Sequence, residues 1–269
     1  MNRHTSIAAI LTLLGALHAV AQEDSPTFDI FPGEKVFPMF TADALAHGMS
    51  IGRVTNNSEW IGSIGAALPL VQANVWGRSW QLGASATAFN RIIKTPGHIT
   101  VYTIDYKVDF PLDLRLQSLA LRVALGHVSS HFADDGIEIL DEQSISYVRD
   151  YVTFAAAYDI PLLAGYVYAG ADWNYHFEPT TEPWILQIGG EGANLKLNGW
   201  ARLFAAFDVK FRQNLSWGTT QSYEAGIRFF VKQRYALRLA YTFRTGFEER
   251  GQFYDQKESV HLVSLFIDF

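Results

Sequence analysis

The chain of 269 residues contains no cysteine. It therefore cannot form a disulfide, a thiolate metal site or a lipidated N-terminal cysteine. It also has no excess of basic residues. Removing Arg3 with an N-terminal leader from the 21 basic residues leaves 20 against 27 acidic ones, a charge of about −7. A nucleic-acid partner is disfavoured, because such a partner requires a basic surface.

Long apolar runs are also absent after residue 21, although hydrophobic residues make up 49% and aromatic residues 14% of the chain. Apolar residues are therefore spread by alternation, and no transmembrane helix is expected there. Residues 7–17 form an apolar stretch that is shorter than the roughly 20 residues a membrane anchor needs. Arg3 precedes this stretch, and Ala19-Val20-Ala21 follows it. The pattern predicts a secretory signal peptide, 1–21, cleaved before Gln22.

The last segment of the chain, 259–269, alternates between apolar and polar residues. One face carries Val263, Leu265, Ile267 and Phe269, and the other carries Ser264 and Asp268. This alternation is typical of a strand between lipid and a wet lumen. A final strand with a terminal aromatic residue also predicts recognition by the barrel-assembly machinery.

Twelve segments show the same alternation: 47–54, 59–68, 76–91, 99–110, 114–129, 147–158, 162–176, 184–192, 201–213, 218–231, 234–246 and 259–269. They predict an all-β fold, a transmembrane antiparallel β-barrel of about 12 strands over residues 39–269 with both termini periplasmic. Residues 22–38 are then an N-terminal periplasmic arm. A soluble β-sandwich is the alternative, and it would bury the aromatic faces against each other.

Turn positions follow from the same count. Proline cannot donate to a strand ladder, so Pro69, Pro111 and Pro161 are predicted to mark periplasmic turns. The longer linkers 130–146 and 247–258 are predicted to be extracellular loops. Within strand 162–176, Asp172, Asn174 and His176 are expected to face the lumen, opposite Trp173 and Tyr175.

The predicted lumen carries charges of both signs: Asp105, Lys107, Arg122, Asp172, Asp208, Lys210, Glu224, Arg228 and Arg238. A barrel of about 12 strands is wider than side chains alone fill. These charges either pair and close the lumen or line a narrow pore. The leading interpretation is an outer-membrane barrel with a structural or transport-related role and no assigned solute.

Strand 114–129 contains an exception to the outward apolar stripe. Leu119, Leu121, Val123 and Leu125 point outward, and the same parity continues into His127 and Ser129 near the predicted extracellular end. Residues two apart on a strand share a face, so an imidazole there can activate the hydroxyl. Asp150 shares the outward parity on the next strand and is the first candidate to orient the imidazole, with Asp141 in the loop as the second. Polar side chains at a barrel rim are the alternative explanation. A metal site at His127, His131, Asp134 and Asp135 is a weaker alternative, and no metal ligand is predicted.

The sequence His127-Val128-Ser129 on an outward strand resembles the arrangement in outer-membrane phospholipase A and the outer-membrane lipid A deacylase. This resemblance implies a serine hydrolase that acts on outer-membrane lipids as its partners, needs no cofactor and can use calcium. The third member in those families lies about a dozen residues beyond the serine, which corresponds to Asp141. The glycine and asparagine pattern around the phospholipase site is absent, because Ser130-His131-Phe132 follows the serine.

Two stretches, 37–44 and 126–135, resemble the most recognisable parts of an uncharacterised family of Gram-negative outer-membrane proteins, known only as a domain of unknown function. The chain has Phe132-Ala133 where that family tends to have Leu-Gly. This resemblance implies a barrel in the outer membrane of a Gram-negative bacterium and implies no activity.

Overall fold

The computed structural model describes residues 26–95, 97–133, 136–137, 143–232 and 235–268. The predicted signal peptide, 1–21, lies outside these residues. The strands are β1 (Thr27–Ile30), β2 (Met49–Val54), β3 (Glu59–Val75), β4 (Arg78–Thr95), β5 (His98–Leu116), β6 (Leu119–Phe132), β7 (Tyr147–Ile160), β8 (Gly165–Glu178), β9 (Trp184–Lys196), β10 (Ala201–Arg212), β11 (Gly218–Lys232), β12 (Tyr235–Phe247) and β13 (Lys257–Asp268). In the described part of the chain, no helix is long and apolar enough to cross a membrane.

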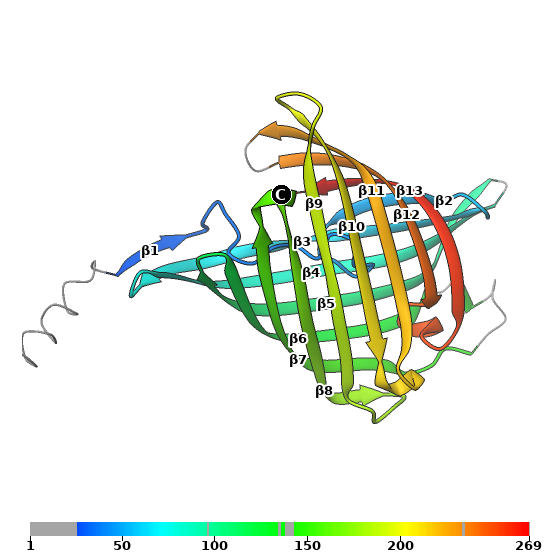
Figure 1. Ribbon diagram of the computed structural model, residues 1–269. Coiled ribbons are helices and arrows are strands. Elements are labelled where there is room, and N and C mark those ends of the chain that lie inside the picture. The colour runs from blue at the N-terminus through cyan, green and yellow to red at the C-terminus, as the bar shows by residue number, and fades with distance from the viewer. Residues whose placement is uncertain (1–25, 96, 134–135, 138–142, 233–234, 269) are drawn as a thin grey trace, which may run out of the picture.

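Strands β2–β13 form a closed antiparallel barrel of twelve strands (Figure 1). Each strand pairs with the next, and β13 closes the ring by pairing with β2, with Leu265 opposite Ile51. The predicted all-β barrel is therefore confirmed. The short strand β1 lies outside the ring and pairs with the far end of β3. In the predicted arm, 22–38, β1 is thus held along the edge of β3, and Val36 and Phe37 are buried.

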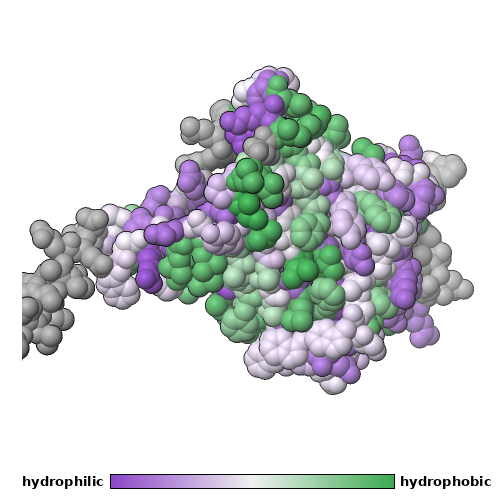
Figure 2. Space-filling model, viewed as in Figure 1, coloured by the Kyte–Doolittle hydropathy of each residue, from purple (hydrophilic) through white to green (hydrophobic). Residues whose placement is uncertain are grey.

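The outer wall is apolar, as the alternation predicts. On β13, Val263 is 47% exposed and Leu265 is 44% exposed, whereas Ser264 between them is buried. Figure 2 shows hydrophobic side chains spread over the barrel wall and hydrophilic ones concentrated toward its ends. This distribution is typical of a barrel that meets lipid on the outside.

Two of the three predicted proline turns are wrong. Pro161 does begin a turn, η1 (Pro161–Leu163), between β7 and β8. Pro69 instead lies inside β3, where a register shift toward β4 follows it, and Pro111 lies inside β5. At Pro69 this shift already interrupts the ladder, so a proline is tolerated there. Both prolines approach Gly83, where an added Cβ would lie 3.1 Å from the Pro111 side chain.

The true turns after β3 and β5 have a different signal. Trp76 and Gly77 join β3 to β4 with φ angles of 55° and 66°, and Gln117 before β6 has a φ of 55°. Tight hairpin turns need positive φ angles, which glycine adopts without strain. Strands β3 and β5 therefore extend further than the sequence pattern predicted.

An N-terminal plug, residues 36–48, enters the lumen. Phe37 belongs to a buried apolar cluster with inward residues of three neighbouring strands, including Ala120 on β6 and Tyr168 on β8. The Arg122 guanidinium lies 4.3 Å from the centre of the Phe37 ring, a cation–π contact. Further along the plug, His47 bonds to Asp109 at 2.7 Å. Apolar and polar contacts therefore both hold the plug against the inner wall.

The last loop, residues 248–256 between β12 and β13, folds into the lumen from the opposite end. Glu248 and Arg250 are each 1% exposed and bond to each other at 3.0 Å. Arg91 on β4 also donates to Glu248, at 2.8 Å. The predicted extracellular loop 247–258 is thus an inward loop fastened by buried ion pairs.

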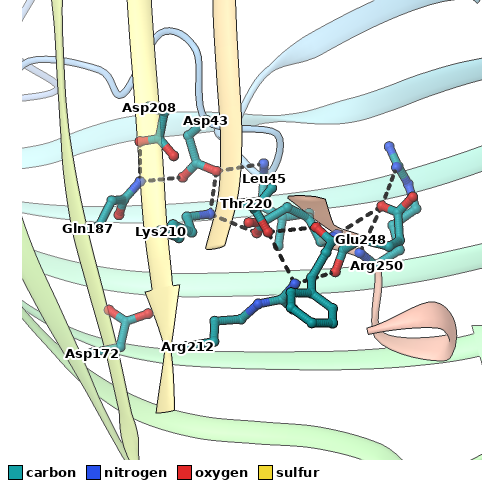
Figure 3. A network of polar contacts seen from close by, with 12 residues as sticks. Asp43, Leu45, Asp172, Gln187, Asp208, Lys210, Arg212, Thr220, Glu248 and Arg250 are labelled. Atoms are coloured by element: carbon teal, nitrogen blue, oxygen red, sulfur yellow. Dashed lines mark hydrogen bonds and ion pairs between the residues drawn. The ribbon is translucent and has the colours of Figure 1, made fainter. Parts of the chain in front are cut away.

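Lys210 on β10 connects the plug to the last loop. Its ammonium donates to Asp43 of the plug at 2.6 Å and to Glu249 of the last loop at 2.9 Å (Figure 3). Gln187 also donates to Asp208 at 2.6 Å and Asp43 at 3.3 Å. Burial by itself raises the pKa of both Asp43 and Glu249, but the Lys210 ammonium lowers each pKa below its usual range. Both carboxylates are therefore ionised at neutral pH.

Other lumen charges also pair: Arg122 with Asp113, Arg228 with Glu191, and Arg238 with Glu224 and Asp268. Cavities of about 120 and 70 Å³ lie between the plug, the last loop and the wall. Among the described residues, the predicted lumen charges therefore mostly pair, whereas Asp105 and Asp208 accept hydrogen bonds from Ser130 and Gln187.

This filled lumen leads to a prediction about conductance. In planar lipid bilayers, the purified protein is expected to give no stable unitary current steps, because the plug and the last loop occupy the path of a solute. The same measurement on Arg122→Gln and Arg238→Gln variants serves as a control. Stable steps in the wild type, with a size that these substitutions change, would show a conducting lumen and contradict the prediction.

Candidate functional site

Strands β6 and β7 bring two of the predicted site residues into contact on the outer face. In the β6–β7 ladder, His127 stands opposite Asp150. The Nδ1 atom of His127 lies 2.6 Å from Oδ1 of Asp150, and the side chains are 45% and 27% exposed. Leu125, on the same face of β6, is 57% exposed. The imidazole and the carboxylate thus meet on the outer face, toward the C-terminal end of β6 and just beyond its apolar stripe.

The bond to Asp150 determines which nitrogen of His127 is free. An ionised carboxylate only accepts hydrogen bonds, so the Nδ1–H of His127 donates to Asp150. In the neutral imidazole, the Nε2 atom then keeps its lone pair. This is the tautomer that a general base needs if it is to take a proton from a serine.

Ser129 lies two residues beyond His127 on the same face of β6 and is half-buried. Its ladder neighbours are Tyr106 on β5 and Val148 on β7. Within the described residues, no hydrogen bond joins the Ser129 hydroxyl to the His127 ring. Such bonds are often long without substrate and tighten when it binds. The structure thus places the predicted pair on one face with the hydroxyl unattached to the imidazole.

His176 belongs to the same cluster, and its predicted place in the lumen is wrong. The register of β7 and β8 shifts so that Asp150 pairs with His176 while Tyr151 pairs with Asn174. The extra residue, Tyr175, is a β-bulge that turns the following side chain outward. Asn174 stays buried inside, and both Tyr175 and His176 are exposed. Strict alternation carries no signal for this bulge.

His176 holds the second oxygen of Asp150. Its Nδ1 lies 2.9 Å from Oδ2 of Asp150, and its Nε2 lies 3.5 Å from Glu178. Ser146 donates to Glu178 at 2.8 Å. Asp150 therefore accepts from an imidazole on each side, a chain of contacts that restrains its carboxylate.

The other predicted carboxylate, Asp141, lies outside the described residues, as do Asp134 and Asp135 of the weaker metal hypothesis. Of the residues that the structure does describe, no group of three or more His, Asp or Glu side chains is arranged to hold a metal ion.

A closed antiparallel barrel with an apolar outer wall and a charged lumen defines this protein as an outer-membrane-type β-barrel. The chain belongs to the family described as "Protein of unknown function (DUF1207)", which matches residues 47–267. No curated protein matches the chain.

Several solved barrels share the fold. The outer-membrane phospholipase of Salmonella typhi, a dimer with bound calcium, matches with a TM-score of 0.53 and 16% identity, covering 82% of this chain and 90% of that one. Outer-membrane phospholipase A from Escherichia coli matches with a TM-score of 0.52 and 16% identity, covering 87% of this chain and all of that one. The NanC porin matches with a TM-score of 0.47 and 12% identity, covering 83% of this chain and 99% of that one. At 16% identity, the likeness to the two phospholipases shows the fold alone.

Proposed function

We propose that this protein lies in the outer membrane of a Gram-negative bacterium and hydrolyses acyl esters of outer-leaflet lipids at the outward-facing site of His127, Ser129 and Asp150. The observation that carries this proposal is the 2.6 Å bond between His127 Nδ1 and Asp150 on the lipid-facing wall. The two residues are direct cross-strand neighbours, and their bond leaves the Nε2 atom of His127 available to act as a base. Transport through the lumen is less well supported, because the plug and the last loop occupy it.

The surroundings of the site suit a lipid. Below Ser129 on β6, Leu125 and Val123 are 57% and 47% exposed, and Phe154 on β7 is 49% exposed. Acyl chains lying along this apolar stripe bring an ester group to the height of His127 and Ser129. An outward site reaches such an ester without extracting the lipid from the leaflet. This argument supports outer-membrane lipids as the partners of the protein.

The proposed reaction follows the acyl-transfer chemistry of a serine nucleophile. His127 Nε2 takes the Ser129 proton as Oγ bonds to the ester carbonyl carbon. Collapse of the tetrahedral intermediate breaks the bond to the alcohol oxygen, which receives the proton from Nε2. Water then attacks the acyl-serine with His127 again as base, releasing a fatty acid and restoring Ser129. Asp150 orients the imidazole and stabilises its cationic form.

Calcium stays an optional ion in this proposal. The acidic residues for which it was considered include Asp134, Asp135 and Asp141, which lie outside the described residues. No step of the reaction is assigned to calcium, and assays are therefore run with and without it.

A covalent probe tests the nucleophile directly. A fluorophosphonate in detergent micelles is expected to label the wild-type protein at Ser129, because an activated serine attacks the phosphorus. Labelling is expected to vanish in Ser129→Ala and in His127→Ala. If mass spectrometry finds no adduct on Ser129 in the wild type, the proposed hydrolase is wrong.

His176→Ala is a milder change, because His176 acts through Asp150. We expect a decrease in kcat of about tenfold, which corresponds to about 1.4 kcal/mol, with little change in KM. Michaelis–Menten measurements on a micellar ester check this split, and Tyr175→Ala on the same bulge is the matched control. An unchanged kcat would show that Asp150 does not depend on His176 for its orientation.

A further inference from the structure

The last loop binds to the inner face of the barrel wall, directly behind the proposed site. Ser129 faces outward, but its neighbours Val128 and Ser130 face inward and are 1% and 2% exposed. The Ser130 hydroxyl donates to Asp105 on β5 at 2.5 Å. The backbone N–H of Gly251 in the last loop donates to the other oxygen of Asp105 at 2.9 Å. The loop thus reaches the strand that carries Ser129 through a shared carboxylate.

Gln252 makes the direct contacts. Its backbone N–H donates to the Ser130 hydroxyl at 3.1 Å, and its side-chain amide donates to the Ser130 carbonyl at 2.8 Å. The same amide group donates to the Ile145 carbonyl at 2.9 Å, and its oxygen accepts from the Ile145 N–H at 3.0 Å. One buried side chain therefore joins the end of β6 to the segment that leads into β7.

Packing around the loop is equally close. A Cβ added to Gly251 would lie 2.2 Å from the Tyr147 ring and 2.5 Å from Cβ of Ser130. Tyr254 of the last loop packs on Tyr147, with ring centroids 5.5 Å apart. Tyr147 begins β7, the strand that carries Asp150. The last loop thus holds the C-terminal end of β6 and the N-terminal end of β7 from inside the barrel.

We propose that Gln252 is a positioning residue for the lipid-facing site: the last loop, from inside the lumen, sets the spacing of β6 and β7 and thereby aligns Ser129 and His127 with Asp150. This inference rests on the proposed hydrolase function. It couples the contents of the lumen to chemistry on the outer wall, so that movement of the last loop changes the activity. The backbone at Ser130, next to the nucleophile, is the point of this coupling.

The test compares three variants of the full-length protein in micelles. Gln252→Met removes every hydrogen bond of the side-chain amide. Gln252→Glu keeps an acceptor for the Ile145 N–H but loses the donor to the carbonyls of Ser130 and Ile145. Gln256→Met is the matched control, because Gln256 lies in the same loop with an exposed side chain. Circular dichroism checks that each variant keeps its β-structure.

Two measurements are made on each variant. Hydrogen exchange of the backbone amides of residues 128–131 is expected to be at least about tenfold faster in Gln252→Met than in wild type. The rate of fluorophosphonate labelling at Ser129 and kcat for a micellar ester are expected to fall about 10- to 100-fold with KM unchanged. Gln252→Glu is expected to fall at least as far as Gln252→Met, because it places a buried carboxylate oxygen against two carbonyl oxygens. Gln256→Met is expected to match wild type.

The outcomes separate the two proposals. If wild type is not labelled at Ser129, the hydrolase proposal fails and the positioning role fails with it, and hydrogen exchange then measures only whether Gln252 holds β6 against the last loop. If wild type is labelled and Gln252→Met reacts at the same rate, the positioning role is wrong while the hydrolase proposal stands. Unchanged exchange of residues 128–131 in Gln252→Met overturns the inference in either case.

Discussion

Ser129→Ala is expected to lower the rate of fatty-acid release by roughly 10⁴- to 10⁶-fold, because removal of a triad nucleophile leaves only the acceleration from binding and oriented dipoles. Purified protein is incubated with mixed phospholipid and lipid A, with and without calcium, and released fatty acids are measured by mass spectrometry. The His127 Nδ1 bond to Asp150 provides the physical reason, since it leaves Nε2 available to take the Ser129 proton.

Ser118→Ala is the control for this experiment. Ser118 lies in the turn before β6, at the opposite end of that strand from Ser129, and its substitution is expected to leave the rate unchanged. The wild type is also compared with Ser129→Ala for each lipid class. The proposed activity is contradicted if the wild type releases no more fatty acid than Ser129→Ala, both with and without calcium.

Lys210→Met is expected to lower the free energy of unfolding by about 3–5 kcal/mol, because it leaves two buried carboxylates without their cation. Lys210 is 8% exposed and bonds to both Asp43 and Glu249. Its loss therefore weakens the attachment of the plug and of the last loop at once. Urea titration of the protein in lipid vesicles, followed by tryptophan fluorescence, measures the change.

Two further variants check the cause. Lys94→Met removes an exposed lysine near the end of β4 and is expected to change the free energy of unfolding by less than about 0.5 kcal/mol. Adding Asp43→Asn and Glu249→Gln to Lys210→Met neutralises both carboxylates and is expected to recover part of the loss. If Lys210→Met is as stable as Lys94→Met, the connection between the plug and the last loop does not contribute to stability.

The alternation of apolar and polar residues with a period of two predicted most of the fold. Each strand of this barrel meets an apolar medium on one side and a polar lumen on the other. The order of apolar and polar residues therefore shows which side chains point outward and which point inward. Val263 and Leu265 face outward and Ser264 faces inward, as the pattern predicts. The outward parity of His127 and Asp150 is visible for the same reason. Their candidacy needed no three-dimensional information.

Contacts across the barrel had no such local signal. The distance between His127 and Asp150 depends on the register of β6 against β7. The alternation of apolar and polar residues is compatible with several registers, so the sequence does not determine this distance. Ranking Asp150 above Asp141 from the sequence rested on facing alone. The register brings His127 and Asp150 into hydrogen-bond contact, and Asp141 lies outside the described residues, so the ranking stays a prediction.

The sequence by itself determined a barrel with an apolar wall, a charged lumen and an outward His127–Ser129 pair, because each of these depends only on which face a residue occupies. Tertiary structure decided that the plug and the last loop enter the lumen, since their partners lie far away in the sequence, as Asp43 does from Lys210. It also decided that His176 leaves the lumen face for Asp150, because a single extra residue at the Tyr175 bulge reverses the alternation beyond it.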